Sequence, residues 1–345
     1  MAPGKFLQIE PAVARGNLTD SMWKDPKYVI ENKYDGDRRI AQFCGQSVRF
    51  TGRKQSVKDG LYVEKSENVP HLSNLLPSKL DVRLLPTIPR AIPPLKLNGT
   101  VLDGEMVAKG RVAGGQSKLV TSIMGSAPDK AIKKQLDSDW LIYVVFDCLF
   151  WCGRDVRGLP LVQRQEYADQ AVRLWDNPYV DCAMQKQLDK RAFHDQVMLA
   201  GGEGTILKDK TAPYGVDAAW VKVKGVWTAD VVIMGYKDAK EISRKSDGTK
   251  SETKYAKSGM IGAVVVGQYW PGNPDLIEVA SISGMTDEER GEFTRHGDKY
   301  LGRVVRLEHN GREPTHRFRH PRFEAPIVFR EDKAPKMCLI RPGEK

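Results

Sequence analysis

Short strand-like runs of apolar residues recur along the first part of this chain, and only a few of the segments between them have the spacing of a helix. This pattern lacks the regular strand–helix alternation of a parallel α/β sheet. We therefore predict an α+β fold with mixed and antiparallel sheets. The expected strands are residues 28–33, 40–43, 47–50, 100–108 and 141–146, and the expected helices are residues 161–175 and 191–199.

Two changes in composition divide the sequence. Residues 77–100 are rich in proline, which excludes a regular helix or a central strand, so we expect an extended excursion there. A strand-rich region begins just after residues 225–229. A chain of 345 residues is longer than a single core usually serves. We predict two domains, residues 1–226 and 227–345.

The sequence pattern of the second region, residues 227–345, predicts about five strands and one helix. Thr286 and Glu289 form a capping-box signature, and the helix that they begin is expected to run to about Tyr300. This content is typical of a small Greek-key barrel of the OB-fold type. The lysine-rich residues 237–257 are too polar for a core and indicate a solvated hairpin loop or a nucleic-acid contact. The expected strands are residues 231–236, 261–269, 276–283 and 302–309.

The charge balance favours a polyanionic partner. The chain has 54 Lys and Arg against 44 Asp and Glu, a formal net charge of +10. A basic chain without a membrane-type amphipathic stretch is biased toward nucleic acids or nucleotides, although charge alone fits an ordinary basic protein equally well. No apolar run approaches the roughly 20 residues that cross a bilayer, and residues 1–10 lack the core of a secretory signal.

The cysteines argue against a disulfide framework and against structural zinc. Their number is odd and their spacing is wide, which suits a reducing compartment. One close pair is present, without a second Cys or His pair at finger spacing. We expect a cytoplasmic protein with no membrane segment. The five are Cys44, Cys148, Cys152, Cys182 and Cys338.

The sharpest local motif is Lys-Tyr-Asp-Gly-Asp-Arg at residues 33–38, at the end of an expected strand. A lysine serves as an amine nucleophile when burial or nearby positive charge lowers its pKa. On a strand, Lys33 and Asp35 would project from one face, and Gly36 would let the backbone pass close to a ligand. By itself the motif fits a surface turn better, so its meaning depends on the rest of the chain.

Further segments follow in a fixed order, and the series as a whole carries a resemblance. It resembles the motifs of the nucleotidyltransferase superfamily of ATP-dependent DNA ligases, RNA ligases and mRNA capping enzymes, over about residues 30–335. It is most similar to the compact ATP-dependent DNA ligases of short-tailed bacteriophages, which have a nucleotidyltransferase (adenylation) domain and an OB domain. The segments are residues 50–53, 102–107, 143–147, 203–208, 220–224, 319–323 and 330–333.

The resemblance implies that Lys33 attacks the α-phosphate of ATP, releases pyrophosphate and carries AMP on its side-chain nitrogen. Lys222 and Lys224 stand two apart on a strand-like run, so both ammonium groups face the same side. Such paired cations would hold the α-phosphate and lower the pKa of a neighbouring lysine. The expected catalytic residues are Lys33, Asp35, Arg38, Lys222 and Lys224.

The resemblance also assigns the rest of the nucleotide pocket. Glu105 would contact the ribose and, with Glu203, bind Mg²⁺ or Mn²⁺, because carboxylates suit a hard cation; both glutamates are expected on strands beside glycine. Phe146 would stack on adenine, and Glu31 would accept a hydrogen bond from the adenine amino group. The expected ATP-binding residues are Glu31, Lys33, Arg38, Arg53, Glu105, Phe146, Lys222, Lys224, Arg330 and Lys333.

Two of these residues, Arg330 and Lys333, belong to the family's C-terminal motif, which orients the pyrophosphate leaving group. By the resemblance, this motif lies on the barrel, moves onto the first domain for lysine adenylation and moves away for DNA binding. Residues 225–229 are the expected hinge.

The expected DNA contacts are phosphate contacts without base readout, because a sealing enzyme works at any sequence. Arg38 and Arg53 carry forked guanidinium groups suited to phosphate and ribose oxygens, although Gly52 stands where family members usually have serine or threonine. The loop at residues 237–257 would add to the grip. The expected DNA-binding residues are Arg53, Arg303, Arg306, Arg312, Arg317, Arg319 and Arg322.

The predicted reaction seals a nick in duplex DNA in three steps. AMP passes from ATP to Lys33, then to the 5′-phosphate at the nick, and the 3′-hydroxyl attacks with loss of AMP. Such an enzyme serves DNA replication, repair and recombination in a bacterial or phage-infected cytoplasm, and we expect a monomer. The alternatives are an RNA ligase, a capping-type nucleotidyltransferase and a non-catalytic OB nucleic-acid-binding protein. An NAD-dependent ligase would carry a nicotinamide domain before the lysine and a four-cysteine zinc module, which this sequence lacks.

Overall fold

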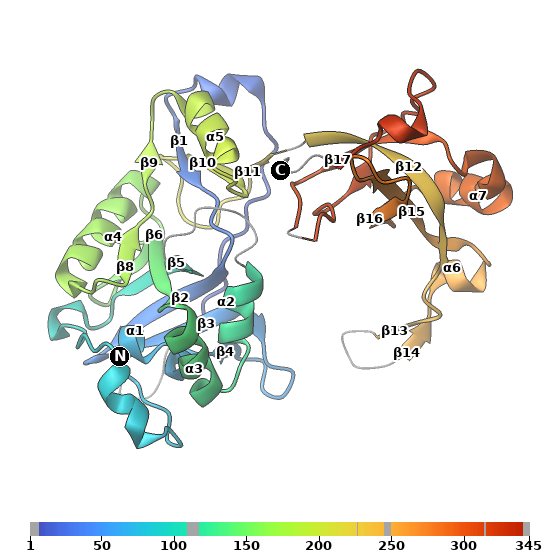
Figure 1. Ribbon diagram of the computed structural model, residues 1–345. Helices are drawn as coiled ribbons and strands as arrows, with labels where there is room; N and C mark the ends of the chain where they lie inside the picture. Colours follow the sequence, from blue (N-terminus) through green and yellow to red (C-terminus); the bar gives the residue numbers. More distant parts are fainter. Residues whose placement is uncertain (1–6, 109–116, 226, 245–249, 314, 341–345) are drawn as a thin grey trace. The chain divides into compact units, whose positions relative to one another are not determined.

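The chain forms two units with separate hydrophobic cores in the computed structural model (Figure 1). The first unit is Met1–Lys224 and the second is Gly225–Lys345. In the described part of the chain, no helix is long and apolar enough to cross a membrane. The residues that the structure describes are 7–108, 117–225, 227–244, 250–313 and 315–340.

The larger sheet of the first unit has the order β4-β3-β2-β5-β6-β7, and β8 joins it by pairing with β6 in parallel. All other neighbours pair antiparallel. Its apolar side chains pack with those of α2, α3 and α4 into one core. The elements are β2 (Asp37–Cys44), β3 (Ser47–Gln55), β4 (Tyr62–Glu64), β5 (Val101–Val107), β6 (Ile142–Trp151), β7 (Arg154–Asp155), β8 (Val180–Cys182), α1 (Pro70–Ser73), α2 (Ser117–Met124), α3 (Pro128–Ser138) and α4 (Leu161–Trp175).

A smaller antiparallel sheet has the order β11-β10-β1-β9. Phe193 and Val197 of helix α5 pack on Ile30, Leu207 and Val221 of its strands. The apolar face of α5 therefore covers one face of this sheet. Polar side chains of the strands lie on the other face. The elements are β1 (Tyr28–Asn32), β9 (Gln185–Lys186), α5 (Lys190–Leu199), β10 (Gly204–Asp209) and β11 (Trp220–Lys224).

The second unit contains a five-stranded antiparallel sheet of order β16-β15-β12-β17-β18 in its described residues. Helix α7 opens with the expected capping box between Thr286 and Glu289, and Phe293 anchors it to the core. The elements are β12 (Trp227–Asp238), β13 (Ile242–Arg244), β14 (Lys250–Glu252), α6 (Lys254–Lys257), β15 (Ile261–Tyr269), β16 (Leu276–Ile282), α7 (Asp287–His296), β17 (Val304–His309) and β18 (Arg322–Phe323).

The α+β class with antiparallel and mixed sheets agrees with the sequence prediction, while several local expectations need correction. The excursion at residues 77–100 is not simply extended, because it contains 3-10 turns at Val82–Thr87 and Leu95–Leu97. The polar loop at residues 237–257 includes the hairpin β13–β14 and the short helix α6; residues 245–249 lie outside the described part, as do residue 226 of the expected hinge and residues 1–6.

Candidate active site

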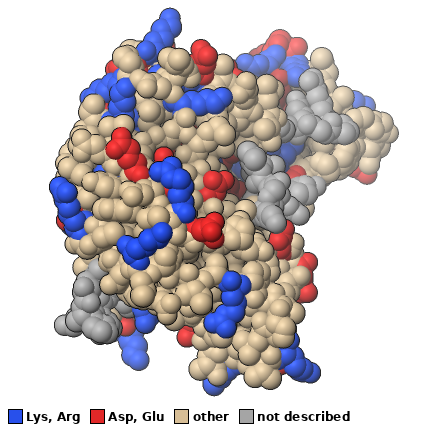
Figure 2. All heavy atoms as spheres, turned by 90° about the vertical axis from the view of Figure 1, so that its left-hand side faces the viewer, with Lys and Arg blue, Asp and Glu red and all other residues tan. Residues whose placement is uncertain are grey.

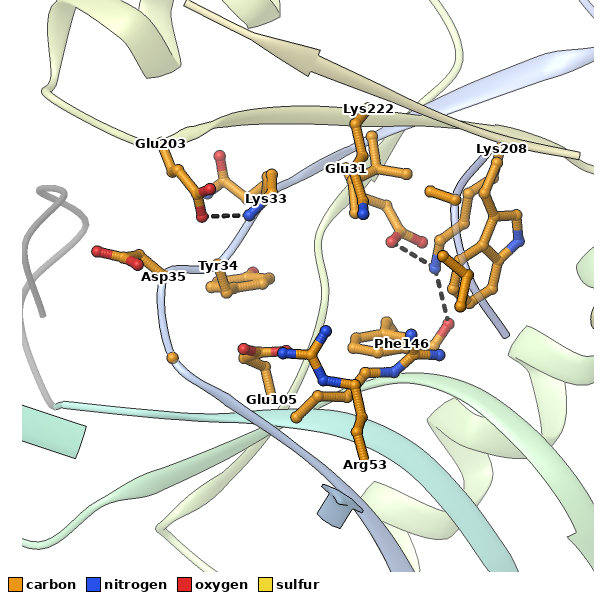
Figure 3. A pocket seen from close by; sticks show the side chains of 17 residues that line it. Glu31, Lys33, Tyr34, Asp35, Arg53, Glu105, Phe146, Glu203, Lys208 and Lys222 are labelled. Atoms are coloured by element: carbon orange, nitrogen blue, oxygen red, sulfur yellow. Dashed lines mark hydrogen bonds and ion pairs between the residues drawn. The ribbon is translucent and has the colours of Figure 1, made fainter. Parts of the chain in front are cut away.

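A cavity in the first unit collects side chains from both of its sheets (Figure 3). It has a volume of about 250 Å³ and is bordered by the loop after β1 and by residues of β2, β3, β5, β6, β10 and β11. Lys224, at the end of β11, is not among the lining residues, and Arg330 and Lys333 belong to the second unit. The expected site residues that line the cavity are Glu31, Lys33, Asp35, Arg38, Arg53, Glu105, Phe146, Glu203 and Lys222.

Lys33 follows the last residue of β1 and is held at the cavity by both its backbone and its side chain. Its N–H donates to the carbonyl oxygen of Gly204 at 2.9 Å, and its Nζ forms an ion pair with Oε2 of Glu203. The Nζ of Lys224 contacts the other oxygen of that carboxylate at 3.2 Å. Glu203 therefore fixes two ammonium groups beside each other.

Two expectations about this segment are wrong. β1 ends at Asn32, so Lys33 and Asp35 lie in a loop instead of on one face of a strand. Glu203 precedes β10 and is also in a loop. The side chains of Lys33 and Glu203 nevertheless point toward each other across the cavity rim (Figure 3).

Gly36 is needed at its position for a different reason from the one expected. A Cβ atom there would lie 2.0 Å from the carbonyl oxygen of Met106 and 2.9 Å from Cγ of Glu105. The next residue, Asp37, pairs with Met106 where β2 meets β5. The absence of a side chain therefore lets the lysine loop enter the larger sheet, and the close neighbour is protein backbone, not ligand.

Lys222 adds a second ammonium group to the cavity from β11. Burial lowers the pKa of Lys222 from its ordinary value, and the positive charges of Lys33, Lys224, Arg53 and Arg38 lower it further. Clustered cations of this kind favour a negatively charged ligand, because a bound anion relieves their mutual repulsion.

Glu105 contributes a carboxylate to the cavity from β5. Burial raises the pKa of Glu105 to about 8, although Arg38, Lys33 and Arg53 oppose the shift. In the part of the chain that the structure describes, no set of three or more His, Cys, Asp and Glu residues is arranged to hold a metal ion.

The far end of the cavity contains an ion pair that the sequence reasoning missed. The Nζ of Lys208 lies 2.6 Å from Oε2 of Glu31, and the two side chains are only 1% and 2% exposed. The same Nζ lies 4.5 Å from the ring centre of Phe146 and 4.2 Å from that of Trp220. This end of the cavity combines two aromatic rings with one buried carboxylate, as expected for a site that holds a planar polar ring.

Lys208 and Trp220 both lie within motif segments recognised in the sequence, yet neither received a role. The available signal was a lysine directly after the apolar pair Ile206 and Leu207, in a strand that is mostly buried. A lysine in such a run needs a buried acid as partner. Its partner, Glu31, lies far away in the sequence.

Arg38 is fixed by a buried carboxylate that was also given no role. Its Nε and Nη2 donate to the two oxygens of Asp103 at 2.9 Å and 2.5 Å, and its guanidinium carbon lies 5.3 Å from the ring centres of both Phe146 and Trp220. The hydroxyl of Tyr214 donates to Asp103 at 2.6 Å. Arg38 is therefore held in a fixed position at the cavity, next to the two aromatic rings.

In the second unit, Arg330 and Lys333 meet at one carboxylate. Nη1 of Arg330 lies 2.9 Å and Nζ of Lys333 lies 2.8 Å from Oδ2 of Asp230 on β12. Nε of Arg306, which was expected to contact DNA, lies 3.2 Å from Oδ1 of the same residue. Arg306 is thereby grouped with the C-terminal motif and not with the other arginines.

The other arginines of the expected DNA grip are mostly engaged with partners in the same unit. Arg303 forms an ion pair with Glu331. Arg317 pairs with Glu278 and Arg322 with Glu308, both at 2.7 Å. Arg312 donates to the buried Gln268 at 2.6 Å and lies over the ring of Phe318, and Arg319 is half-buried. Arg317, Arg322 and Arg303 remain partly exposed, so an ion pair does not remove them from solvent.

The family is established by comparison with known proteins. Residues 16–224 match the family described as the ATP dependent DNA ligase domain. This match covers more than half of the chain, which therefore belongs to that family.

Individual relatives agree with this assignment. The SPbeta prophage-derived DNA ligase-like protein LigB of Bacillus subtilis is 25% identical over 239 residues, covering 66% of this chain and 73% of that protein. A probable DNA ligase of Streptomyces avermitilis is 27% identical over 93% of this chain, which spans 59% of that protein's length. A DNA ligase of Methanoculleus marisnigri is 26% identical, and the chain spans only 36% of it.

Among solved structures, a study of Lig E DNA ligases, described as DNA binding with a minimal scaffold, supplies a chain with a similar fold. The two align over 94% of this chain and 100% of the other, with a TM-score of 0.61 and 18% sequence identity. At that identity the likeness bears on the fold alone.

Proposed function

We propose that this protein is an ATP-dependent DNA ligase that seals nicks between a 5′-phosphate and a 3′-hydroxyl in duplex DNA. The observation that carries the proposal is one cavity, lined also by Lys222, in which Lys33 pairs with Glu203 at one end and Phe146 lies at the other (Figure 3). The ring centre of Trp220 lies 6.0 Å from that of Phe146. The cationic end suits phosphates and the aromatic end suits a base, so a nucleotide would present its α-phosphate to the lysine.

In the proposed first step, Nζ of Lys33 forms a bond to the α-phosphorus of ATP and pyrophosphate leaves. Lys33 gives up one proton, which passes to water, and its ion pair with Glu203 holds Nζ at the cavity. Lys222 stabilises the charge on the α-phosphate. Arg38, Asp35 and Arg53 are proposed to position the nucleotide.

We propose Glu105 and Glu203 as the protein ligands of a Mg²⁺ ion. Glu105 is partly exposed at the cavity, and a bound cation would favour its charged form, which desolvation disfavours,. Glu203 already holds two cationic groups. When bound, the ion would offset negative charge on the phosphates.

The two units are proposed to be a nucleotidyltransferase domain, residues 1–226, and an OB domain, residues 227–345. The five-stranded antiparallel sheet and helix α7 of the second unit support an OB-type barrel,. In the proposed cycle, the second domain supplies Arg330 and Lys333 to the pyrophosphate in the first step and holds the DNA phosphates later. The enzyme is proposed to act as a monomer and without sequence preference.

Sealing of a labelled nicked duplex tests the proposal. With ATP and Mg²⁺, the protein should join a 5′-phosphorylated DNA nick and should leave a 5′-hydroxyl nick open, because the second step needs a phosphate to carry AMP. A parallel substrate with RNA on both sides of the nick distinguishes the RNA-ligase alternative. Joining of the RNA nick alone, or binding without joining on either substrate, would refute the assignment as a DNA ligase.

A further inference from the structure

Three cationic side chains of the second unit converge on the carboxylate of Asp230. Arg330 contributes Nη1, which lies within 3.1 Å of both carboxylate oxygens, and Lys333 contributes Nζ at 2.8 Å from Oδ2. Arg306 contributes Nε at 3.2 Å from Oδ1. Arginine and lysine side chains this close repel one another, so a shared carboxylate is what allows them to occupy one place.

The backbone around this cluster is held firmly. Asp230 and Arg306 are directly opposite each other in the β12–β17 pairing, and the carbonyl oxygen of Asp230 accepts a hydrogen bond from the buried Gln268 at 3.0 Å. The N–H of Arg330 donates to Val304 at 2.9 Å, and a turn returns Lys333 toward Arg330. The position of Asp230 is therefore set by the sheet and not by the charges around it.

The cluster keeps surplus positive charge that solvent reaches. Arg330 also pairs with Asp332 at 2.7 Å, so three cations face two carboxylates. The side chains of Arg330, Lys333 and Arg306 are 20%, 23% and 34% exposed, whereas Asp230 is only 11% exposed. An approaching anion meets guanidinium and ammonium groups first, in an arrangement suited to several phosphate oxygens at once.

We propose that Asp230 is a positioning residue that holds Arg306, Arg330 and Lys333 as one polyphosphate-binding cluster, and that Arg306 acts on the nucleotide instead of gripping DNA. This inference rests on the proposed function, because the polyphosphate is the pyrophosphate portion of ATP. The cluster serves the step in which pyrophosphate leaves. The later steps, in which no pyrophosphate takes part, do not need it.

The test separates the steps with four variants of the full chain, one of which is Asp230→Glu. Asp230→Asn removes the shared charge with little change in shape, and Arg306→Gln removes one member of the cluster. Arg295→Gln is the matched control, since Arg295 is an exposed arginine of α7, outside the cluster and not among the expected DNA contacts. For each, the rate of covalent labelling by α-labelled ATP is compared with sealing of a nick that already carries AMP on its 5′-phosphate.

Asp230→Asn and Arg306→Gln should slow covalent labelling by about 10- to 100-fold, as expected for lost support of a binding group, and should seal the pre-adenylated nick within about 3-fold of the parent rate. Asp230→Glu should recover part of the labelling rate, and Arg295→Gln should label normally and seal the pre-adenylated nick normally. Normal labelling by Arg306→Gln, or equal losses in both assays for Asp230→Asn, would overturn the proposal.

Pyrophosphate binding to the same proteins, measured by calorimetry, does not depend on lysine chemistry. It should weaken in Asp230→Asn and Arg306→Gln and remain unchanged in Arg295→Gln. If the parent protein takes no label from ATP but shows this binding pattern, the proposed function fails while the polyphosphate cluster stands. If pyrophosphate binds all variants equally, the cluster assignment fails whatever the enzyme does.

Discussion

At the scale of single residues, two ion pairs that are largely shielded from water shape the cavity, Lys208 with Glu31 and Arg38 with Asp103. The sequence supplied the nucleophile candidate Lys33 and its neighbours from short motifs, because such motifs keep their spacing within one strand or loop. It gave no means of pairing Lys208 with Glu31 or Arg38 with Asp103, although all four stand in or beside those motifs. Partners from different strands meet only through the sheet register, and register is a tertiary property.

Lys208 offers a direct test of such a pair. Replacing it with methionine leaves Glu31 buried without a countercharge, so Lys208→Met should lower the free energy of unfolding by about 3–5 kcal/mol and raise the KM for ATP. Glu31→Gln added to Lys208→Met should recover part of the stability. Denaturant titration and ATP titration give the two readouts, with the exposed Lys79→Met as control. Stability of Lys208→Met equal to that of the parent would contradict the role given to this pair.

His71 makes stability depend on pH. Its Nε2 lies 2.9 Å from the carbonyl oxygen of Leu141, and burial lowers its pKa from 6.5 to about 4. Between these values the unfolded chain binds a proton that the folded chain does not. The free energy of unfolding should therefore fall as pH decreases from about 6.5 toward about 4, by up to about 3 kcal/mol from this group.

Urea titrations from about pH 7 to about pH 4.5 measure this dependence. His71→Gln should flatten the curve relative to the parent protein, whereas the exposed His296→Gln should leave its slope unchanged. Parallel curves for the parent and His71→Gln would show that the imidazole does not carry the effect.

At the scale of elements, long periodic segments were predictable and short ones were not. The helix at residues 161–175 was found with those bounds as α4, and the capping box identified the start of α7. Helices α2 and α3 were missed: α2 has only 8 residues, and α3, with 11 residues, has few apolar ones. Strand β6 continues through Asp147, where the prediction ended, because Arg164 neutralises that buried carboxylate at 2.8 Å.

Gly36 links the lysine loop to the larger sheet, and its substitution tests that connection. A Cβ at this position would collide with the Met106 carbonyl oxygen, so Gly36→Ala should displace the loop and cost about 1–3 kcal/mol of stability. Because Lys33 moves with the loop, covalent labelling by ATP should fall at least about 10-fold. Gly158→Ala, at a site with nothing within 4 Å, is the control. Parent-like labelling by Gly36→Ala would show that the close approach is unimportant for the nucleophile.

At the scale of the whole molecule, the net charge was a weaker guide than the distribution of charge. The sequence suggests a boundary between residues 226 and 227, and the structure divides the chain between Lys224 and Gly225. The surplus of +10 suggested a polyanion without saying which one. In the structure, basic residues gather at the cavity of the first unit and around Asp230 in the second. At both places they form local clusters suited to binding phosphate groups. Such gathering depends on tertiary contacts that no local pattern records.

The proposed mechanism depends on one covalent bond, between AMP and Lys33. The protein is incubated with ATP and Mg²⁺, digested, and analysed by peptide mass spectrometry. The variant Lys33→Ala is treated in the same way, as is the control Lys186→Ala, whose lysine lies on β9 of the smaller sheet. The mechanism predicts one added AMP on the peptide at Lys33 in the parent protein and in Lys186→Ala. The added AMP should be absent in Lys33→Ala, and it should be lost from the parent protein when nicked DNA is added. AMP on a different lysine, or AMP retained by Lys33→Ala, would contradict it.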